Sequence, residues 1–140
     1  MYPAQNDEPT APAEGYKPRL RVLVVDDDPD TVTTLVDLLR TEGHDARGHA
    51  SGQAAIDALQ GFMPDVVISD IAMPNVNGWT LAKEVRKKMG KHPLLIAITG
   101  QYTKSADKVL SHISGFDYYL TKPADPNVLL TLVAQAQNGT

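Results

Sequence analysis

Short apolar runs alternate with longer amphipathic stretches along most of this chain of 140 residues. Each apolar run has the length of a buried strand, and the stretch after it carries apolar residues at the three- and four-residue spacing of a helix. Strands that are apolar throughout, rather than at alternate positions, are typical of a parallel sheet covered by helices on both faces. The pattern predicts five strand–helix units of the α/β class, with a weaker strand at Asp45–His49 and stronger ones at about Leu20–Val25, Val66–Ser69, Leu94–Ile98 and Phe116–Leu120.

Capping residues and glycines mark the ends of the predicted helices. Ser and Asp side chains accept hydrogen bonds from the free N–H groups of a first helical turn, and glycine is favoured just after a last turn. On these signals Ser51 and Asp125 begin the second and the last helix, and either Asp28 or Asp30 begins the first. Further helices are predicted at about Trp79–Met89 and Ser105–Ile113, and the last is predicted to cover about Pro126–Gln137.

Composition indicates one folded domain behind a polar leader. Residues 1–17 are rich in proline and polar residues, which predicts a disordered tail or a linker, and residues 18–138 are expected to form the domain. The chain contains no cysteine, which excludes disulfides and thiol chemistry. No apolar run approaches the roughly 20 residues that span a bilayer, and the N-terminus lacks the apolar core of a signal peptide. We therefore expect a cytoplasmic protein.

The charge pattern argues against nucleic acid as a direct partner. The formal net charge is −4, and phosphate contacts need clustered Lys and Arg on one face. The densest basic stretch is interpreted as the solvated face of the third helix; it comprises Lys83, Arg86, Lys87, Lys88 and Lys91.

Four of the predicted strands end directly before polar residues that can do chemistry. Asp26 and Asp27 follow the first strand, Asp70 the third, Thr99 the fourth and Lys122 the fifth. Because the carboxyl ends of parallel strands open into one crevice, these side chains are expected to meet there. Carboxylates are ligands that Mg²⁺ prefers, and a hydroxyl and an ammonium can hold a phosphoryl group. The sequence therefore predicts a site that handles a phosphoryl group with a divalent cation.

The acids after the first strand admit a second interpretation. Carboxylates at a helix N-terminus are favoured by the helix dipole, which accounts for Asp28 and Asp30 better than for Asp26 and Asp27. An EF-hand calcium loop is excluded, because the glycine and the final glutamate that it needs are missing at the required spacing. Asp70 stands alone at the end of its strand and fits either a metal ligand or a carboxylate nucleophile.

These strand ends carry a resemblance to a known family. The chain resembles the receiver domain of two-component response regulators over about Arg19–Ala136. The resemblance implies a doubly wound parallel sheet of five strands in the order 2-1-3-4-5, which is flavodoxin-like. The segments that carry it are residues 22–29 (VLVVDDDP), 64–74 (PDVVISDIAMP), 77–78 (NG), 96–100 (IAITG) and 115–123 (GFDYYLTKP).

The resemblance also implies roles for individual residues, with Mg²⁺ as the cofactor. Asp70 is the implied phosphoacceptor. The implied metal ligands are Asp27, Asp70 and the main-chain carbonyl of Ala72, with Asp26 acting through water. Thr99, Lys122 and Tyr119 are the implied phosphate-binding and switch residues, and Ala72 and Gln101 are implied to tune the lifetime of the phosphoryl group.

The implied function is a phosphoacceptor domain of a two-component phosphorelay. It takes a phosphoryl group from a phosphohistidine and switches the face formed by the fourth helix, fifth strand and fifth helix. The implied partners are a histidine kinase or histidine phosphotransfer protein and a downstream protein, with no nucleic acid or membrane. Such a domain is no enzyme in the usual sense, because it catalyses only its own phosphorylation and dephosphorylation.

Two other functions remain open at this point. One is a receiver-like binding module that signals without phosphorylation, and the other is a phosphatase with an Asp nucleophile. The sequence also leaves open whether the domain is a stand-alone regulator or a part of a hybrid sensor kinase. It does not reveal the stimulus, the cognate kinase, the lifetime of the phosphoryl group or the oligomeric state.

Overall fold

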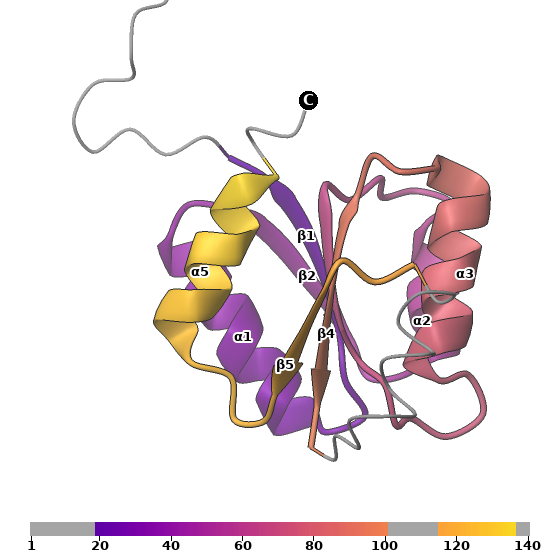
Figure 1. The fold of residues 1–140 in the computed structure, drawn as a ribbon, viewed down its shortest axis with the longest axis horizontal. Helices are drawn as coiled ribbons and strands as arrows, with labels where there is room; N and C mark the ends of the chain where they lie inside the picture. The colour runs from indigo at the N-terminus through magenta and orange to yellow at the C-terminus, as the bar shows by residue number, and fades with distance from the viewer. Residues whose placement is uncertain (1–18, 101–114, 137–140) are drawn as a thin grey trace, which may run out of the picture.

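The computed structural model describes residues 19–100 and 115–136, and these form a sheet of five parallel strands flanked by helices (Figure 1). The strand order is β2-β1-β3-β4-β5, as expected, so the fold is a flavodoxin-like α/β fold. The fourth predicted helix, at Ser105–Ile113, lies outside the described residues. The elements are β1 (Arg21–Val25), α1 (Pro29–Thr41), β2 (Asp45–His49), α2 (Gly52–Ala58), β3 (Val66–Asp70), α3 (Gly78–Met89), β4 (Leu94–Thr99), β5 (Tyr118–Thr121) and α5 (Pro126–Gln135).

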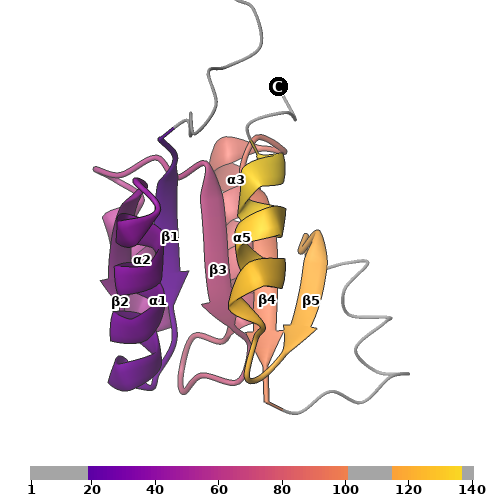
Figure 2. The same ribbon diagram turned by 90° about the vertical axis from the view of Figure 1, so that its left-hand side faces the viewer.

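Helices cover both faces of the sheet, and this explains why the strands are apolar throughout. Helices α1 and α5 lie on one face, and α2 and α3 lie on the other (Figure 1). In β1, Val22 and Val24 pack toward α1 and α5, whereas Leu23 and Val25 pack toward α2 and α3. All five residues of β3 are buried. Figure 2 shows the strands side by side behind α1 and α5, with their arrowheads at the same end.

The predicted helix starts agree with the structure. Asp28 is the N-cap of α1, and its side chain accepts a hydrogen bond from the N–H of Asp30. Ser51 caps α2 and Asp125 caps α5 in the same way. In each case a short side chain with an oxygen acceptor caps the first turn and marks the start of the helix. None of the helices that the structure describes is long and apolar enough to cross a membrane.

Strand β5 begins at Tyr118, two residues later than the predicted start at Phe116. The intervening Asp117 bonds to the start of β4 with its side chain, because its Oδ2 accepts from the N–H of Leu95 at 2.8 Å. Phe116 is buried, and its ring meets that of Tyr119 edge-on at 5.6 Å between centroids. The sequence pattern located the strand correctly, but the side-chain hydrogen bond of Asp117 replaces the first part of the regular pairing between β4 and β5.

Arg86 does not belong to a solvated helix face, in contrast to its lysine neighbours on α3. Its guanidinium donates to the main-chain oxygens of Gly90, Pro93 and Gly115 and to the carboxylate of Asp117, at distances between 2.7 and 3.1 Å. These contacts use all the donors that a guanidinium offers. The side chain therefore ties α3 to the start of β4 and to the segment before β5.

Another arginine lies at the edge of the sheet. Strand β2 is the terminal strand on one side of the described sheet. The Nε and Nη2 atoms of Arg40, on α1, donate to the main-chain oxygen of Ala46 in β2 at 3.0 and 2.8 Å.

Candidate functional site

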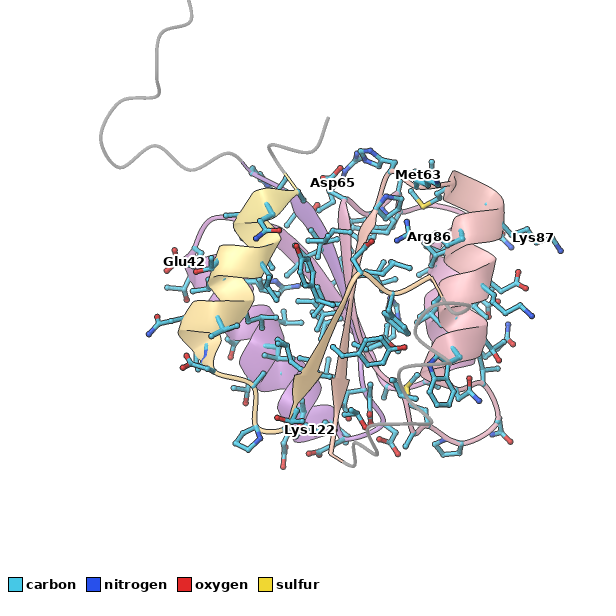
Figure 3. All side chains as sticks on the ribbon, viewed as in Figure 1. Glu42, Met63, Asp65, Arg86, Lys87 and Lys122 are labelled. Carbon is cyan, nitrogen blue, oxygen red and sulfur yellow. The ribbon has the colours of Figure 1, made fainter. Side chains whose placement is uncertain are left out.

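Four strand ends deliver their polar residues to one edge of the sheet, as predicted. Asp26 follows β1, Asp70 and Thr99 are the last residues of β3 and β4, and Lys122 follows β5. Asp26, Asp70 and Thr99 are only 2%, 5% and 4% exposed, which is unusual for such polar side chains. Figure 3 shows Lys122 at this end of the molecule and Asp65 at the opposite end.

Three carboxylates form a cluster at this edge. Asp26, Asp27 and Asp70 each offer a carboxylate oxygen, and these atoms lie within 4.8 Å of one another. Asp26 and Asp70 are buried and Asp27 is exposed, so the cluster opens toward solvent on one side. Like charges this close repel, and a divalent cation would offset the repulsion. The all-oxygen donor set fits Mg²⁺, which binds through few carboxylates and keeps several waters.

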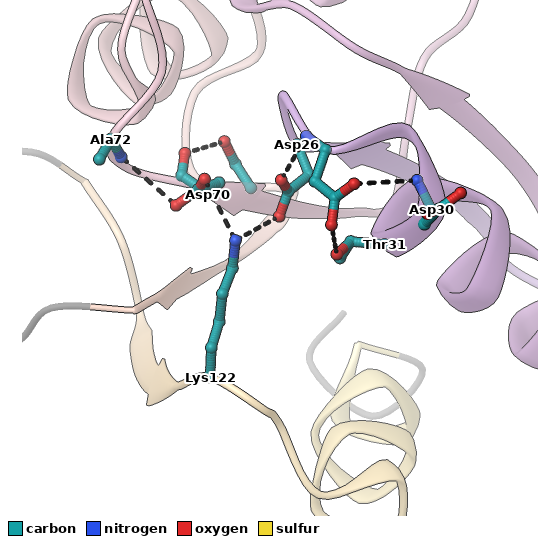
Figure 4. A network of polar contacts seen from close by, with 8 residues as sticks. Asp26, Asp30, Thr31, Asp70, Ala72 and Lys122 are labelled. Carbon is teal, nitrogen blue, oxygen red and sulfur yellow. Dashed lines mark hydrogen bonds and ion pairs between the residues drawn. The ribbon is translucent and has the colours of Figure 1, made fainter.

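Lys122 balances part of this negative charge. Its Nζ lies 2.9 Å from Oδ2 of Asp26 and 3.3 Å from Oδ2 of Asp70 (Figure 4). Burial alone would favour the neutral amine, but the hydrogen bond to Asp26 and the charges of both carboxylates outweigh it and raise the pKa of Lys122. The side chain is therefore a permanent cation in the pocket.

The pKa of Asp70 is also raised, although the carboxylate touches a lysine. Burial is the largest cause, the nearby charge of Asp26 adds to it, and the attraction of Lys122 only partly opposes both. Two buried carboxylates thus share one ammonium. Lys122 alone does not compensate both carboxylates, so a further cation bound at Asp70 would stabilise its charged form.

Backbone N–H groups orient the acids of the first and third strands. Oδ1 of Asp26 accepts from the N–H of Asp28 at 2.9 Å, and Oδ1 of Asp70 accepts from the N–H of Ala72 at 3.3 Å (Figure 4). Asp28 itself accepts from Oγ1 of Thr31 and caps α1. The helix-dipole interpretation therefore holds for Asp28, while Asp26 and Asp27 belong to the acidic cluster.

Helix α3 packs directly against the backbone of Asp70. A Cβ atom on Gly78, its first residue, would lie 2.3 Å from the main-chain oxygen of Asp70 and 2.8 Å from Cα of Ile71. The N–H of Gly78 donates to the oxygen of Ile71 at 2.9 Å, and Asn77 caps the helix. Only glycine permits this approach, so the Asn-Gly pair seen in the sequence positions the helix against the site.

Asp70 borders a cavity of about 680 Å³ on the side of α3. Asp70, Thr99 and Lys122 line it together with Ala72 and Gly100, and so does Trp79. Ala72 is exposed at the rim, whereas Gln101 lies outside the described residues.

Trp79 is a site residue that the sequence analysis did not identify. Its indole Nε1 donates to Oη of Tyr119 at 3.0 Å, and Tyr119 is half-buried on β5. The signal in the sequence was the one tryptophan of the chain, placed directly after Asn77 and Gly78. Helical periodicity alone could not show that its ring reaches across to β5.

Comparisons with known proteins agree with this geometry. The family described as the response regulator receiver domain matches residues 22–134. An uncharacterized 14.6 kDa protein of Leptolyngbya boryana is 38% identical over 118 residues, which are 84% of this chain and 89% of that protein. The DNA-binding response regulator MtrA of Mycolicibacterium smegmatis is 36% identical over 115 residues, which are 82% of this chain but 49% of MtrA. The chain thus spans about half the length of that relative.

Solved structures show the same architecture. The chemotaxis protein CheY4 of Vibrio cholerae matches with a TM-score of 0.78 and 28% sequence identity, covering 85% of this chain and 99% of CheY4. The family match extends across β1 to α5 and includes all three acids and the lysine of the pocket. The chain therefore belongs to the response regulator receiver domains, a family of generally non-catalytic signalling modules that work with histidine kinases in two-component systems.

Proposed function

We propose that this domain is the phosphoacceptor of a two-component phosphorelay, with Asp70 as the residue that takes the phosphoryl group. The observation that carries the proposal is the cluster of Asp26, Asp27 and Asp70, with oxygens within 4.8 Å of one another and Lys122 in contact with two of them. The donor is a phosphohistidine of a histidine kinase or a histidine phosphotransfer protein.

The transfer is an in-line displacement at phosphorus. A carboxylate oxygen of Asp70 attacks, a new O–P bond forms as the P–N bond to the donor histidine breaks, and the histidine nitrogen keeps the electron pair. Asp27, Asp70 and the carbonyl of Ala72 would hold Mg²⁺ directly and Asp26 would hold it through water, and the ion would neutralise negative charge on the transferred oxygens. Lys122, in contact with Asp26 and Asp70, contributes a fixed positive charge, so most of the catalysis is positioning and charge stabilisation.

Phosphorylation changes the charge balance that holds the pocket together. The new oxygens compete with Asp26 for Lys122, and the hydroxyl of Thr99 lines the same cavity. Both residues sit at strand ends, so drawing them toward the phosphoryl group moves the ends of β4 and β5. Tyr119 lies three residues before Lys122 and is expected to follow.

We assign the output to the face that includes β5 and α5. Helix α5 carries no charged residue, and its Val128 is 44% exposed, whereas α3 is covered by lysines. An uncharged helix surface next to a moving strand suits a protein partner better than nucleic acid. Ala72, at the rim of the pocket, and Gln101 would tune how long the phosphoryl group survives.

The test is labelling of the purified chain with acetyl phosphate in Mg²⁺, followed by intact-mass measurement. The wild-type protein is expected to gain one phosphoryl group, and Asp70→Asn is expected to gain none. Asp37→Asn, at an exposed position on α1, is the matched control and is expected to label like the wild type. Full labelling of Asp70→Asn would refute the assignment.

Two further measurements, of Mg²⁺ binding and of phosphate-ester hydrolysis, separate the two alternative functions. Binding of Mg²⁺ without any labelling would favour a module that signals without phosphorylation. Repeated turnover of a phosphate ester would favour a phosphatase.

A further inference from the structure

One hydrogen bond joins the two sides of the phosphoacceptor cavity. Trp79 lies in the first turn of α3, whose first residue packs on the backbone of Asp70. Tyr119 lies on β5, three residues before Lys122. The bond from Nε1 of Trp79 to Oη of Tyr119, at 3.0 Å, therefore links the helix that packs on the backbone of Asp70 to the strand that leads into Lys122.

The ends of β4 and β5 are coupled to each other as well. The N–H of Lys122 donates to the main-chain oxygen of Thr99 at 2.8 Å, so the backbones of these two residues are linked directly. Tyr119 pairs with Ala97 in the same ladder. A displacement of Thr99 and Lys122 toward a phosphoryl group is therefore transmitted to Tyr119.

Helix α3 is held against such a displacement. Arg86, near its other end, bonds to Gly115 and Asp117 at the entry to β5, far from the acids. Gly78 is in contact with the backbone of Asp70 and Ile71. Trp79 thus stays in place while the carboxyl end of β5 moves. A hydrogen bond of 3.0 Å is lost when its atoms separate by about half an ångström more.

We propose that Trp79 is a positioning residue that resists activation: its bond to Tyr119 holds the end of β5 in the resting arrangement and must break when the pocket takes a phosphoryl group. This inference rests on the proposed phosphoacceptor function. If a phosphoryl group can bind only after this hydrogen bond has broken, its binding free energy is less favourable by the free energy of the bond. For one neutral hydrogen bond the apparent affinity falls about twofold to tenfold.

The test is calorimetric titration of the full chain with beryllofluoride, a phosphoryl analogue, in the presence of Mg²⁺. Tyr119→Phe keeps the ring and removes only the hydroxyl, and it is expected to bind beryllofluoride about twofold to tenfold more tightly than the wild type. Trp79→Phe is expected to show a gain of similar size. The double variant is expected to gain no more than either single variant, because both changes remove the same bond.

Tyr118→Phe is the matched control. Tyr118 is the neighbouring residue of β5, and its hydroxyl donates to Oε1 of Gln135 on α5 at 2.6 Å. Tyr118→Phe removes a tyrosine hydrogen bond from the same strand but away from the cavity, so its affinity for beryllofluoride is expected to equal that of the wild type. Equal tightening in Tyr118→Phe would show that general loosening of β5 is the cause and would overturn the proposal.

A second readout follows the bond itself. Trp79 is the one tryptophan, so its fluorescence reports its own surroundings. Beryllofluoride is expected to shift the emission of the wild type toward that of Tyr119→Phe, and to change the emission of Tyr119→Phe itself little.

The outcomes distinguish this proposal from the function on which it rests. If the wild type binds beryllofluoride and Asp70→Asn does not, but Tyr119→Phe binds with unchanged or lower affinity, the positioning role of Trp79 is wrong and the phosphoacceptor function stands. If the wild type binds no beryllofluoride, both are wrong.

Discussion

Gly78→Ala tests whether helix α3 sets the position of Asp70, the proposed acceptor. The added Cβ would lie 2.3 Å from the oxygen of Asp70, where ordinary contacts begin at about 3.4 Å. The helix start or the backbone of Asp70 must therefore move by about 1 Å. Overpacking of this kind costs about 1–3 kcal/mol, and a misplacement of about 1 Å at a reacting group can cost about a hundredfold in rate.

The sign of the stability change makes this prediction sharp. Replacing glycine by alanine in a helix normally stabilises it by about 1 kcal/mol. A loss of stability in Gly78→Ala would therefore come from the steric contact alone. For a chain of this length we expect the melting temperature to fall by roughly 4 to 12 °C, together with a large fall in the initial rate of labelling by acetyl phosphate.

Gly61→Ala is the matched control, because a Cβ there meets nothing within 4 Å. Its stability is expected to stay within about 0.5 kcal/mol of the wild type, with an unchanged labelling rate. Both quantities come from thermal denaturation followed by circular dichroism and from intact-mass time courses. Wild-type labelling by Gly78→Ala would refute the reasoning that α3 positions Asp70.

Three further predictions follow from the charges and contacts described above. Mg²⁺ at about a hundred times its dissociation constant is expected to stabilise the wild type by about 2.7 kcal/mol, and Asp27→Ala, which removes the exposed carboxylate of the cluster, is expected to lose most of that gain in a thermal shift assay. The folded state raises the pKa of Asp70 above 3.8. The stability that the protonated Asp70 contributes is therefore fully present below pH 3.8, and it is lost as the pH rises through the pKa that Asp70 has in the folded protein. Without Mg²⁺, Asp70→Asn is therefore expected to melt higher than the wild type at pH 7, and the difference is expected to vanish toward pH values below about 4; equal melting at pH 7 would contradict the unfavourable charge. Arg86→Lys, which cannot reach all the partners of the guanidinium, is expected to cost about 1–3 kcal/mol in urea unfolding while labelling at Asp70 continues.

The sequence was sufficient for the parts of the site that depend on topology. Parallel strands place their carboxyl ends at one edge, so Asp26, Asp70 and Lys122 could be expected to meet before any coordinates were known. Contacts between side chains of distant elements could not be predicted in this way. The bond between Trp79 and Tyr119 depends on the ring of a helix residue reaching across to another strand.

The role of Arg86 escaped prediction for a related reason. A basic residue within a lysine-rich helix is normally solvated, and no spacing along the chain shows that carbonyl groups of two loops converge on its guanidinium. The late start of β5 is another case. The carboxylate of Asp117 accepts a hydrogen bond from the main chain of β4, and the regular backbone pairing of β5 begins only after it. In each case a polar side chain settles the local structure.

The contact between Arg40 and Ala46 has a practical consequence for handling the protein. The outermost strand of a sheet can recruit a strand of another molecule, and such pairing leads to swapped assemblies and fibres. A strand of another molecule that pairs with β2 would need the main-chain oxygen of Ala46. It would first have to displace the guanidinium of Arg40, which makes two hydrogen bonds to that oxygen. Concentrated samples, such as those used for crystallisation or nuclear magnetic resonance, are therefore expected to resist strand-to-strand aggregation from this side.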